Sequence, residues 1–239
     1  MKIALVGYGK TGQMVGKTID EAAGLECVGI VSAKHTSNLF AIKEKPDVII
    51  DFSHPANLDM ISEYAERNPV ALVLGTTGYS PQQIELIEEL AKKNPVVSTA
   101  NFSLGITILQ QVLQQITPVL RERFDIELIE KHHRRKLDAP SGTAKLLLNS
   151  LEKGKAYEKR YGREGMRKRG EEIGIHSIRG GTIAGEHTVI FAGDDEILEM
   201  THRADSNRIF AVGAVLAAQF AAGQEPGLYS MNDVLFHKL

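Results

Sequence analysis

The sequence has few of the features that mark disulfide-rich, metal-binding or membrane proteins. Its 239 residues include one cysteine and no tryptophan. The single cysteine, Cys27, excludes an intrachain disulfide and a CxxC metal site. No HExxH motif or comparable ligand spacing occurs, so we expect no bound metal. No apolar run approaches the ~18 residues of a membrane span, and the chain enters a predicted strand directly after Met1 without a secretory signal, which favours a cytoplasmic protein.

Neither sign of charge dominates the chain. Lys and Arg total 28 and Asp and Glu total 30, for a formal net charge of −2. A balance this even argues against general nucleic-acid binding. The hydrophobic content of 43% and charged content of 24% are ordinary for a globular protein, and the length allows one large domain or two modest ones.

The first hundred residues alternate short apolar runs with helical patterns. Buried strands are predicted at 2–6, 26–31, 46–52, 70–74 and 95–98, with helices between them. This order predicts right-handed βαβ crossovers and a Rossmann-type, doubly wound parallel sheet of the α/β class. In such sheets ligands bind beyond the carboxyl ends of the strands.

A glycine motif follows the first strand, in the order strand, turn and helix. The motif is G-x-G-x-x-G, formed by Gly7, Tyr8, Gly9, Lys10, Thr11 and Gly12. Its glycines permit a tight turn and let a pyrophosphate approach the backbone at the start of a helix, predicted from Gln13 to about Ala23. The alternative is a glycine-rich turn that only packs the helix on the sheet.

Three further strand ends carry candidate cofactor residues. The dinucleotide fingerprint expects an acid about 20 residues after the glycines, but Ser32 and Lys34 stand there. These two residues suit a 2′-phosphate, so we expect NADPH to be used at least as well as NADH, unless Lys34 is simply exposed. Two turns are candidate walls for the nicotinamide half: Gly75, Thr76 and Thr77, and Thr99, Ala100, Asn101 and Phe102.

The second half of the chain has a different pattern. A helix is predicted at 103–121, and strands near 125–132, 173–178, 183–192 and 196–203 follow without regular helical crossovers. This predicts a second α+β domain built on an open mixed sheet, spanning 103–211, with 1–102 and 212–239 forming the first domain. Residues 153–172 read as a mobile surface loop, a plausible lid or subunit contact. His176, His187 and His202 fall in strands, where a core or an oligomer interface is the simplest place for them.

The stretch from Glu130 to Ala144 has the highest concentration of candidate catalytic and binding residues. Two adjacent histidines, His132 and His133, and Lys136 lie at the end of a predicted strand, and a Pro-Ser-Gly-Thr turn follows. Ser141 and Thr143 are candidate N-caps for the next helix. Cations beside a helix N-terminus suit an anionic ligand that must also receive a proton. The alternative is a solvated strand end followed by a turn and cap.

These motifs together resemble the dihydrodipicolinate reductase family. The resemblance spans nearly the whole chain in order, through GYGKTG, GTTG, TANFS, EKHHRRKLDAPSGTA, IGIHSIRGGTIAGEH and THRA. It implies NAD(P)H-dependent reduction of 4-hydroxy-tetrahydrodipicolinate, a small dicarboxylate, with loss of water, in lysine biosynthesis through diaminopimelate. It also implies a homotetramer built through the sheet of the central domain, and no nucleic-acid or membrane partner.

Carried over by position, the resemblance assigns roles to particular residues. His132 would be the proton donor and acceptor, and Lys136 a second proton donor. His133 would bind the substrate carboxylates with the turn at Gly142 and Thr143. The glycine motif, Lys34 and the two turns after the fourth and fifth strands would line the NAD(P)H site. One departure is Ser32, where several family members have an acid, and it bears on the choice between NADPH and NADH.

Two other functions share some of these features. Another two-domain nicotinamide dehydrogenase, acting on amino acids or polyols, would share the glycine motif but does not account for the histidine pair, Lys136 and the Pro-Ser-Gly-Thr turn. A cofactor-sensing regulator that binds nucleic acid through residues 153–172 would bind the cofactor without turnover.

Overall fold

The chain divides into two compact units in a computed structural model that describes residues 1–236. The first unit comprises Met1–Leu104 and the segment from Asn207 onward, and the second comprises Gly105–Ser206. The sequence-based domain boundaries, at 102/103 and 211/212, differ from these by a few residues, the second because the helix that returns to the first unit begins at Arg208.

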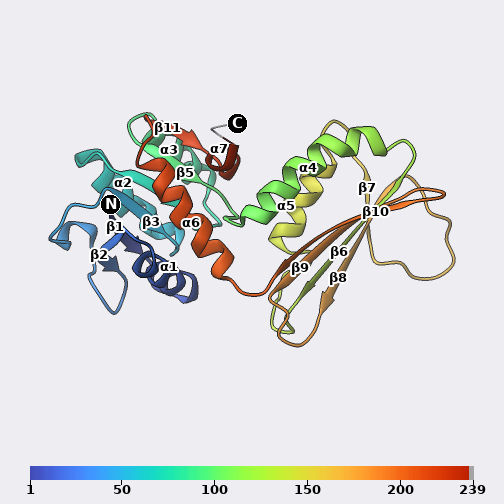
Figure 1. Cartoon of the computed structure of the whole chain (residues 1–239), viewed down its shortest axis with the longest axis horizontal. Helices are drawn as coiled ribbons and strands as arrows, with labels where there is room; N and C mark the ends of the chain where they lie inside the picture. The colour runs from blue at the N-terminus through green and yellow to red at the C-terminus, as the bar shows by residue number, and fades with distance from the viewer. Residues whose placement is uncertain (237–239) are drawn as a thin grey trace. The chain divides into compact units, whose positions relative to one another are not determined.

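The first unit is built on a six-stranded sheet whose paired strands are all parallel, which confirms the Rossmann-type prediction (Figure 1). Its strand order is β11-β5-β4-β3-β1-β2. The strands are β1 (Lys2–Val6), β2 (Glu26–Val31), β3 (Val48–Asp51), β4 (Ala71–Leu74), β5 (Pro95–Ser98) and β11 (Gly227–Tyr229). The helices are α1 (Lys10–Glu21), α2 (Leu58–Arg67), α3 (Pro81–Ala91), α6 (Arg208–Ala221) and α7 (Met231–Phe236), with short 3-10 turns η1 (Leu39–Ala41) and η2 (Pro55–Asn57).

Helices cover both faces of this sheet. One apolar cluster joins α1, α6 and α7 to the strands, and a second joins α2 and α3 to the opposite face. The central strands β3 and β4 are buried along their whole length, which explains why they read as continuous apolar runs.

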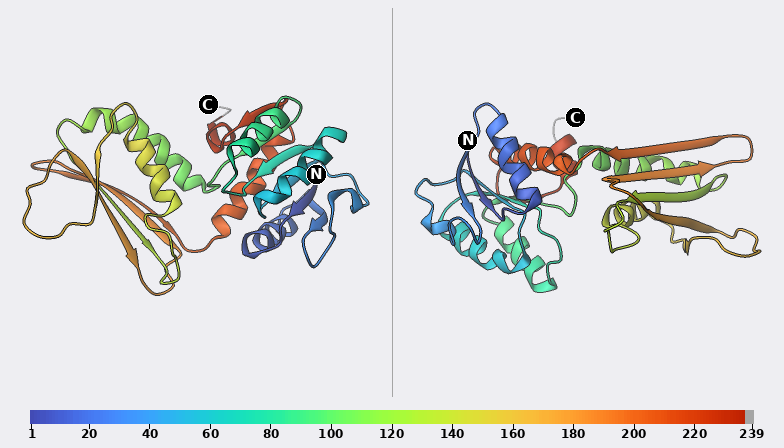
Figure 2. Two further views of the ribbon diagram at one scale, coloured as in Figure 1. Left: turned by 180° about the vertical axis from the view of Figure 1, so that it is seen from behind. Right: turned by 90° about the horizontal axis from the view of Figure 1, so that it is seen from below.

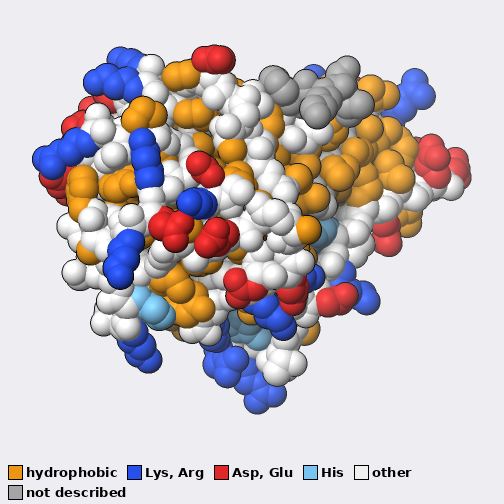
Figure 3. Space-filling view, turned by 60° about the vertical axis from the view of Figure 1, so that its left-hand side comes forward, with side chains coloured by type: hydrophobic (Ala, Val, Ile, Leu, Met, Phe, Trp, Pro, Cys, Tyr) orange, Lys and Arg blue, Asp and Glu red, His pale blue; other side chains and the backbone are white. Residues whose placement is uncertain are grey.

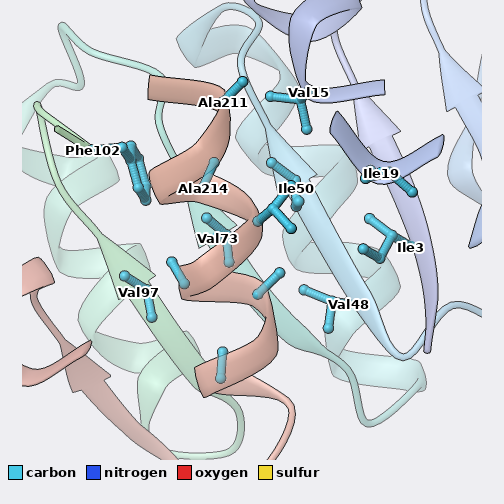
Figure 4. Close-up of a cluster of buried hydrophobic side chains, with 14 of the residues drawn as sticks. Ile3, Val15, Ile19, Val48, Ile50, Val73, Val97, Phe102, Ala211 and Ala214 are labelled. Atoms are coloured by element: carbon cyan, nitrogen blue, oxygen red, sulfur yellow. The ribbon is translucent and has the colours of Figure 1, made fainter. Parts of the chain in front are cut away.

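Helix α6 lies close against the sheet because its packing face is made of small residues. Ala211 and Ala214 are fully buried beside Ile50 and Val73 (Figure 4). Gly213 approaches the backbone even more closely, since a Cβ placed there would lie 1.8 Å from the carbonyl oxygen of Phe102. The alanine-rich sequence of 207–222 is therefore a packing requirement.

One local prediction in the first unit is corrected. Ser80 and Gln83 form a capping box at the start of α3, and β11 pairs in parallel with β5, so the C-terminal segment packs on this unit. Helix α1, however, begins at Lys10 and not at Gln13. Its N-cap is Gly9, which has no side chain to cap the helix, so the sequence carries no capping signal there.

The second unit is a five-stranded mixed sheet, as predicted, with strand order β10-β9-β6-β8-β7. The pairings β6–β9 and β9–β10 are antiparallel, whereas β6–β8 and β7–β8 are parallel. Its elements are α4 (Leu104–Leu120), β6 (Asp125–His132), α5 (Gly142–Leu151), β7 (Glu158–Tyr161), β8 (Glu172–Arg179), β9 (Gly185–Ala192) and β10 (Ile197–Ala204).

Both helices of the second unit lie on the same face of its sheet (Figure 2). Leu113 of α4 and Leu147 of α5 are fully buried against Leu128, Ile173 and Phe191 of the sheet. Alternation along β6 directs Ile126, Leu128, Glu130 and His132 toward these helices. Within residues 1–236 no helix covers the opposite face.

The segment 153–172 was expected to be irregular throughout, but four of its residues form strand β7, which pairs with β8. Arginines anchor the rest of the segment to acids of the sheet. Arg163 contacts Glu127 at 2.9 Å and the almost fully buried Glu172 at 2.6 Å, and Arg169 donates to the carbonyl oxygens of Ile126 and Glu172. The charges in this segment therefore serve largely as internal ion pairs.

Two further features concern membranes and charged partners: the length of the apolar helices and the distribution of surface charge. No helix among residues 1–236 is both long and apolar enough to cross a membrane. Cationic and anionic side chains are interspersed over the face drawn in Figure 3. That face carries no broad patch of a single sign.

Candidate active site and cofactor-binding loops

A fully buried carboxylate, Glu130, lies at the centre of the 130–144 stretch. It is on the helix-facing side of β6, two residues before the almost fully buried His132. Alternation alone would place an apolar residue at this position, since Ile126 and Leu128 precede it on the same side. An ionised group without water must be compensated by donors from the protein.

Three segments supply those donors. Glu130 Oε2 lies 2.5 Å from Nδ1 of His132 and accepts from Nη1 of Arg179 at 2.8 Å, while Oε1 accepts from Nη2 of Arg179 at 2.6 Å. The backbone N–H of Ser141 donates to Oε1 at 3.2 Å. One carboxylate therefore connects β6, the end of β8 and the start of α5.

The charge states of this cluster follow from its contacts. Burial alone would raise the pKa of Glu130, but hydrogen bonds from Arg179, Ser177 and His132 outweigh it and lower the pKa to about 2. Burial lowers the pKa of His132, against the opposing effect of the Glu130 carboxylate. An ionised Glu130 can only accept, so Nδ1 of His132 carries the proton and Nε2 of the neutral ring keeps its lone pair.

The start of α5 is fixed by Ser141, as one of the two predicted caps. Its hydroxyl accepts from the N–H of Ala144 at 3.1 Å and lies 2.9 Å from Nε2 of His187. The rings of His187 and His132 pack edge to face, with centroids 5.1 Å apart. Burial and the nearby charge of His132 lower the pKa of His187 to about 4, so His187 is neutral at physiological pH. Gly142 is the first residue of α5, and Thr143 lies in its first turn.

The turn between β6 and α5 carries Lys136 back toward the histidines. Its N–H donates to the carbonyl oxygen of His133 at 3.1 Å, and its ammonium contacts Asp138 at 2.9 Å. The charge of Lys136 acts on both His132 and His187. Arg179 also donates to the carbonyl oxygen of Asp138, so the arginine that neutralises Glu130 supports this turn as well.

Three members of this cluster were not predicted from the sequence: Glu130, Arg179 and His187. Glu130 belongs to the quoted motif, and its signal is an acid on the buried side of a strand. Arg179 and His187 come from β8 and β9 and have no local signal, because their relation to Glu130 and Ser141 depends on strand pairing.

The glycine motif has the geometry that a pyrophosphate requires. Gly7 has φ +89°, and a Cβ on it would lie 2.4 Å from the carbonyl oxygen of Phe52. A Cβ on Gly12 would lie 2.2 Å from the carbonyl oxygen of Gly7, whereas a Cβ on Gly9 would meet no protein atom within 4 Å. Gly9 therefore faces open space at the start of α1, where no side chain caps the first N–H groups. These residues fit a dinucleotide phosphate.

The turns after β4 and β5 are held around one aromatic ring, that of Phe52. A Cβ on Gly75 would lie 2.5 Å from this ring, and the ring centroid of Phe102 lies 5.4 Å from that of Phe52. Thr76 is buried and Thr77 exposed. Asn101 accepts from the N–H of Ser103 at 2.8 Å, which fixes the second turn.

The turn after β2 presents Lys34 to solvent. The N–H of Lys34 donates to the hydroxyl of Ser32 at 3.3 Å, and that hydroxyl lies 2.8 Å from Nδ1 of His35. His35 in turn packs against the ring of Tyr8 in the glycine motif, at 4.9 Å between centroids. The turn therefore lies beside the glycine motif and carries no acid. No group of His, Cys, Asp and Glu within residues 1–236 has the arrangement of a metal site.

Comparison with known proteins assigns the chain to a family. Residues 1–102 match the family profile for the N-terminus of dihydrodipicolinate reductase, and residues 105–235 match the profile for its C-terminus. The chain belongs to the dihydrodipicolinate reductase family. Its relatives include the 4-hydroxy-tetrahydrodipicolinate reductases of Clostridium novyi, at 45% identity over 99% of both chains, and of Methanoregula boonei, at 44% identity over 98% of this chain and 97% of that one.

The fold of this reductase agrees with a solved structure. Dihydrodipicolinate reductase from Paenisporosarcina sp. TG-14, determined with bound dipicolinate, superposes with a TM-score of 0.79 and covers 96% of this chain and 97% of its own. At 22% sequence identity, the likeness establishes the two-unit fold alone. The two family profiles divide the reductase between residues 102 and 105, beside the boundary of its first structural unit.

The ionised Glu130 predicts a pH-dependent stability of the reductase. Glu130→Gln should lower the free energy of unfolding at pH 7 by about 3 kcal/mol, because it leaves Arg179 without its carboxylate. Since the pKa of Glu130 is about 2 in the folded state against an ordinary 4.5, its stabilisation is complete above pH 4.5 and is lost as pH falls toward 2. Urea unfolding gives the free energy of unfolding of the unmodified enzyme and of Glu130→Gln. The difference between these two free energies should therefore shrink as the pH is lowered from 7 to 3. The exposed Glu164→Gln is the matched control, and a difference that stays constant over this range would contradict the assignment.

Proposed function

We propose that this reductase converts 4-hydroxy-tetrahydrodipicolinate to tetrahydrodipicolinate, with loss of water, using His132 and Lys136 as proton donors. The reaction follows from membership of the family, whose relatives at 44–45% identity carry this activity in their names. The roles of the residues are our inference. The observation that carries them is the buried Glu130 carboxylate, which holds His132 beside the N-terminus of α5.

The first unit would hold the nicotinamide cofactor. The glycine motif and the start of α1 accept its pyrophosphate, and Lys34 with Ser32 accepts a 2′-phosphate, so the reductase would use both NADPH and NADH. The turns at Gly75–Thr77 and Thr99–Phe102 would line the nicotinamide half. When bound, the reduced cofactor supplies hydride for the substrate ring.

The second unit would bind the two carboxylates of the substrate. The N–H groups of Gly142 and Thr143 are at the positive end of α5, and a helix N-terminus favours an anion. A Cβ on Gly142 would meet no protein atom within 4 Å, so a carboxylate can approach the backbone there. His133, half-buried beside this turn, would bind a carboxylate as well.

The proton step then depends on the charge of His132. In the free enzyme its pKa is lowered, so the ring is largely neutral at neutral pH. The negative charge of a substrate with two carboxylates favours the protonated, imidazolium form of His132. Nε2 would then donate its proton to the substrate carbon on which negative charge develops when hydride is added. The Lys136 ammonium would stabilise the developing anion and, as a second proton donor, would protonate the hydroxyl group that leaves as water.

The reductase would assemble as a homo-oligomer, which we propose to be a tetramer. The open face of the second sheet supports this proposal. It presents Ile178, 45% exposed, beside the ion pairs of Lys131 and Arg203 with Glu186, and Ile197, 67% exposed, at the other end of β10. Exposed apolar residues next to complementary charges are typical of an interface between identical subunits.

Lys136 tests the proton step. General acid catalysis contributes ~10²–10⁴ in rate, so Lys136→Ala should lower kcat by about that factor while the Kd for NADPH barely changes. The assay follows NADPH absorbance after pyruvate and aspartate semialdehyde are condensed in situ. Lys145→Ala, an exposed cation on α5, is the matched control. Failure of the unmodified enzyme to oxidise NADPH with this mixture would refute the function, whereas full turnover by Lys136→Ala would refute only the role of Lys136.

Lys34 tests the cofactor preference. The unmodified enzyme should show a kcat/KM for NADPH at least equal to that for NADH. Lys34→Ala should lower the NADPH value roughly tenfold with little effect on NADH, because a charge-assisted bond to a phosphate contributes ~1.5–3 kcal/mol. Lys17→Ala, an exposed cation on α1, serves as the control. A strong preference of the unmodified enzyme for NADH would contradict the proposed 2′-phosphate site.

A further inference from the structure

A second buried carboxylate, Asp51, lies in the first unit with no assigned role. It is the last residue of β3, where it pairs with Val6 of β1 and Leu74 of β4. Only 1% of its surface is exposed. Within residues 1–236 no Lys, Arg or His forms an ion pair with it, in contrast to Glu130, whose charge is matched by Arg179.

Hydroxyl groups take the place of a cation around Asp51. The Ser53 hydroxyl donates to Oδ1 through a short hydrogen bond, the Tyr79 hydroxyl donates to Oδ2 at 3.2 Å, and the Thr76 hydroxyl also bonds to the carboxylate. Ser53 and Thr76 are also joined directly, since the N–H of Ser53 donates to the hydroxyl oxygen of Thr76 at 2.9 Å. Asp51 thus connects the turn after β3 to the loop after β4.

Burying a carboxylic acid at this position has a high desolvation cost. Burial raises the pKa of Asp51, although the hydrogen bonds from Ser53, Thr76 and Tyr79 oppose the rise. A neutral acceptor would serve neutral donors at a lower desolvation cost. Costly buried acids of this kind are concentrated at functional sites.

The two segments that Asp51 connects both border the proposed cofactor site. Thr76 belongs to the Gly75–Thr77 turn, proposed to line the nicotinamide half. On the other side, Gly7 of the glycine motif rests on the turn after β3, since a Cβ on Gly7 would lie 2.7 Å from Cβ of Ser53. Because Ser53 is packed against Gly7, loss of the carboxylate link would shift Thr76 and the nicotinamide wall relative to the glycine motif.

We infer that Asp51 is a positioning residue for the cofactor: its carboxylate holds the Gly75–Thr77 turn against the Ser53 turn, in the arrangement that receives the nicotinamide half of the dinucleotide. The inference rests on the proposed cofactor site. It adds a residue that touches neither cofactor nor substrate and acts through Ser53, Thr76 and Tyr79.

The test compares the whole dinucleotide with a fragment that carries only the adenosine half. Dissociation constants for NADPH and for 2′,5′-ADP are measured with the full chain, by fluorescence and calorimetry. Asp51→Asn should weaken NADPH binding roughly tenfold, because one misplaced wall of the site loses on the order of 1.4 kcal/mol, and should leave 2′,5′-ADP binding within about twofold. Asp59→Asn, an exposed acid in the first turn of α2, should change neither value.

The outcomes separate this inference from the proposed function. Failure of the unmodified enzyme to bind NADPH would refute the cofactor site itself. Unchanged NADPH binding by Asp51→Asn, or an equal loss for both ligands, would overturn the positioning role, since a purely structural residue affects both halves alike. Should Asp51→Asn fail to fold, Tyr79→Phe provides the test, because it removes one hydrogen-bond donor to Oδ2. This variant should bind NADPH several-fold more weakly and 2′,5′-ADP with unchanged affinity. Unchanged NADPH binding by Tyr79→Phe, or an equal loss of affinity for both ligands, would refute the inference.

Discussion

The ionised carboxylate of Glu130 is the interaction on which the second unit depends. It has no contact with water, so its charge must be met by Arg179, by His132 and by the backbone of Ser141. Each partner comes from a different segment, and those of β6 and the start of α5 border the proposed substrate site. A buried pair of this kind adds little net stability compared with an apolar core. Its value lies in geometry, because it fixes the ring of His132, the end of β8 and the start of α5 relative to one another.

In the first unit, backbone and aromatic contacts fix the loops at the strand ends relative to one another. The loops after β1, β3 and β4 approach so closely that Gly7 and Gly75 have no room for a side chain, and Phe52 is the surface on which both rest. Asp51 adds a polar connection between two of these loops. The two units therefore share one design, in which functional groups stand at strand ends and a buried acid one or two residues away holds the neighbouring segments in place.

Much of this arrangement could be predicted from local sequence, because its signals are local. Apolar runs marked the parallel strands, the glycine motif marked the turn after β1, and the Pro-Ser-Gly-Thr turn marked the start of α5. The failures involve tertiary contacts. The charged strand Glu158–Tyr161 has no apolar alternation and depends on pairing with β8, and Gly9 starts α1 without a capping side chain. Arg179 meets Glu130 across 49 positions of sequence, so only strand register could reveal the pair.

The protonation of the His132 ring tests the central claim most directly. An ionised Glu130 at Nδ1 requires the neutral ring to carry its proton on Nδ1, whereas free histidine favours Nε2. Nitrogen-15 NMR of the ligand-free enzyme at pH 8, with His132 assigned by substitution, distinguishes the two tautomers. We expect a protonated Nδ1 and an unprotonated Nε2. A His132 ring protonated on Nε2 at that pH would contradict this expectation, because Glu130 would then not be holding the ring in the orientation that presents Nε2 to the substrate.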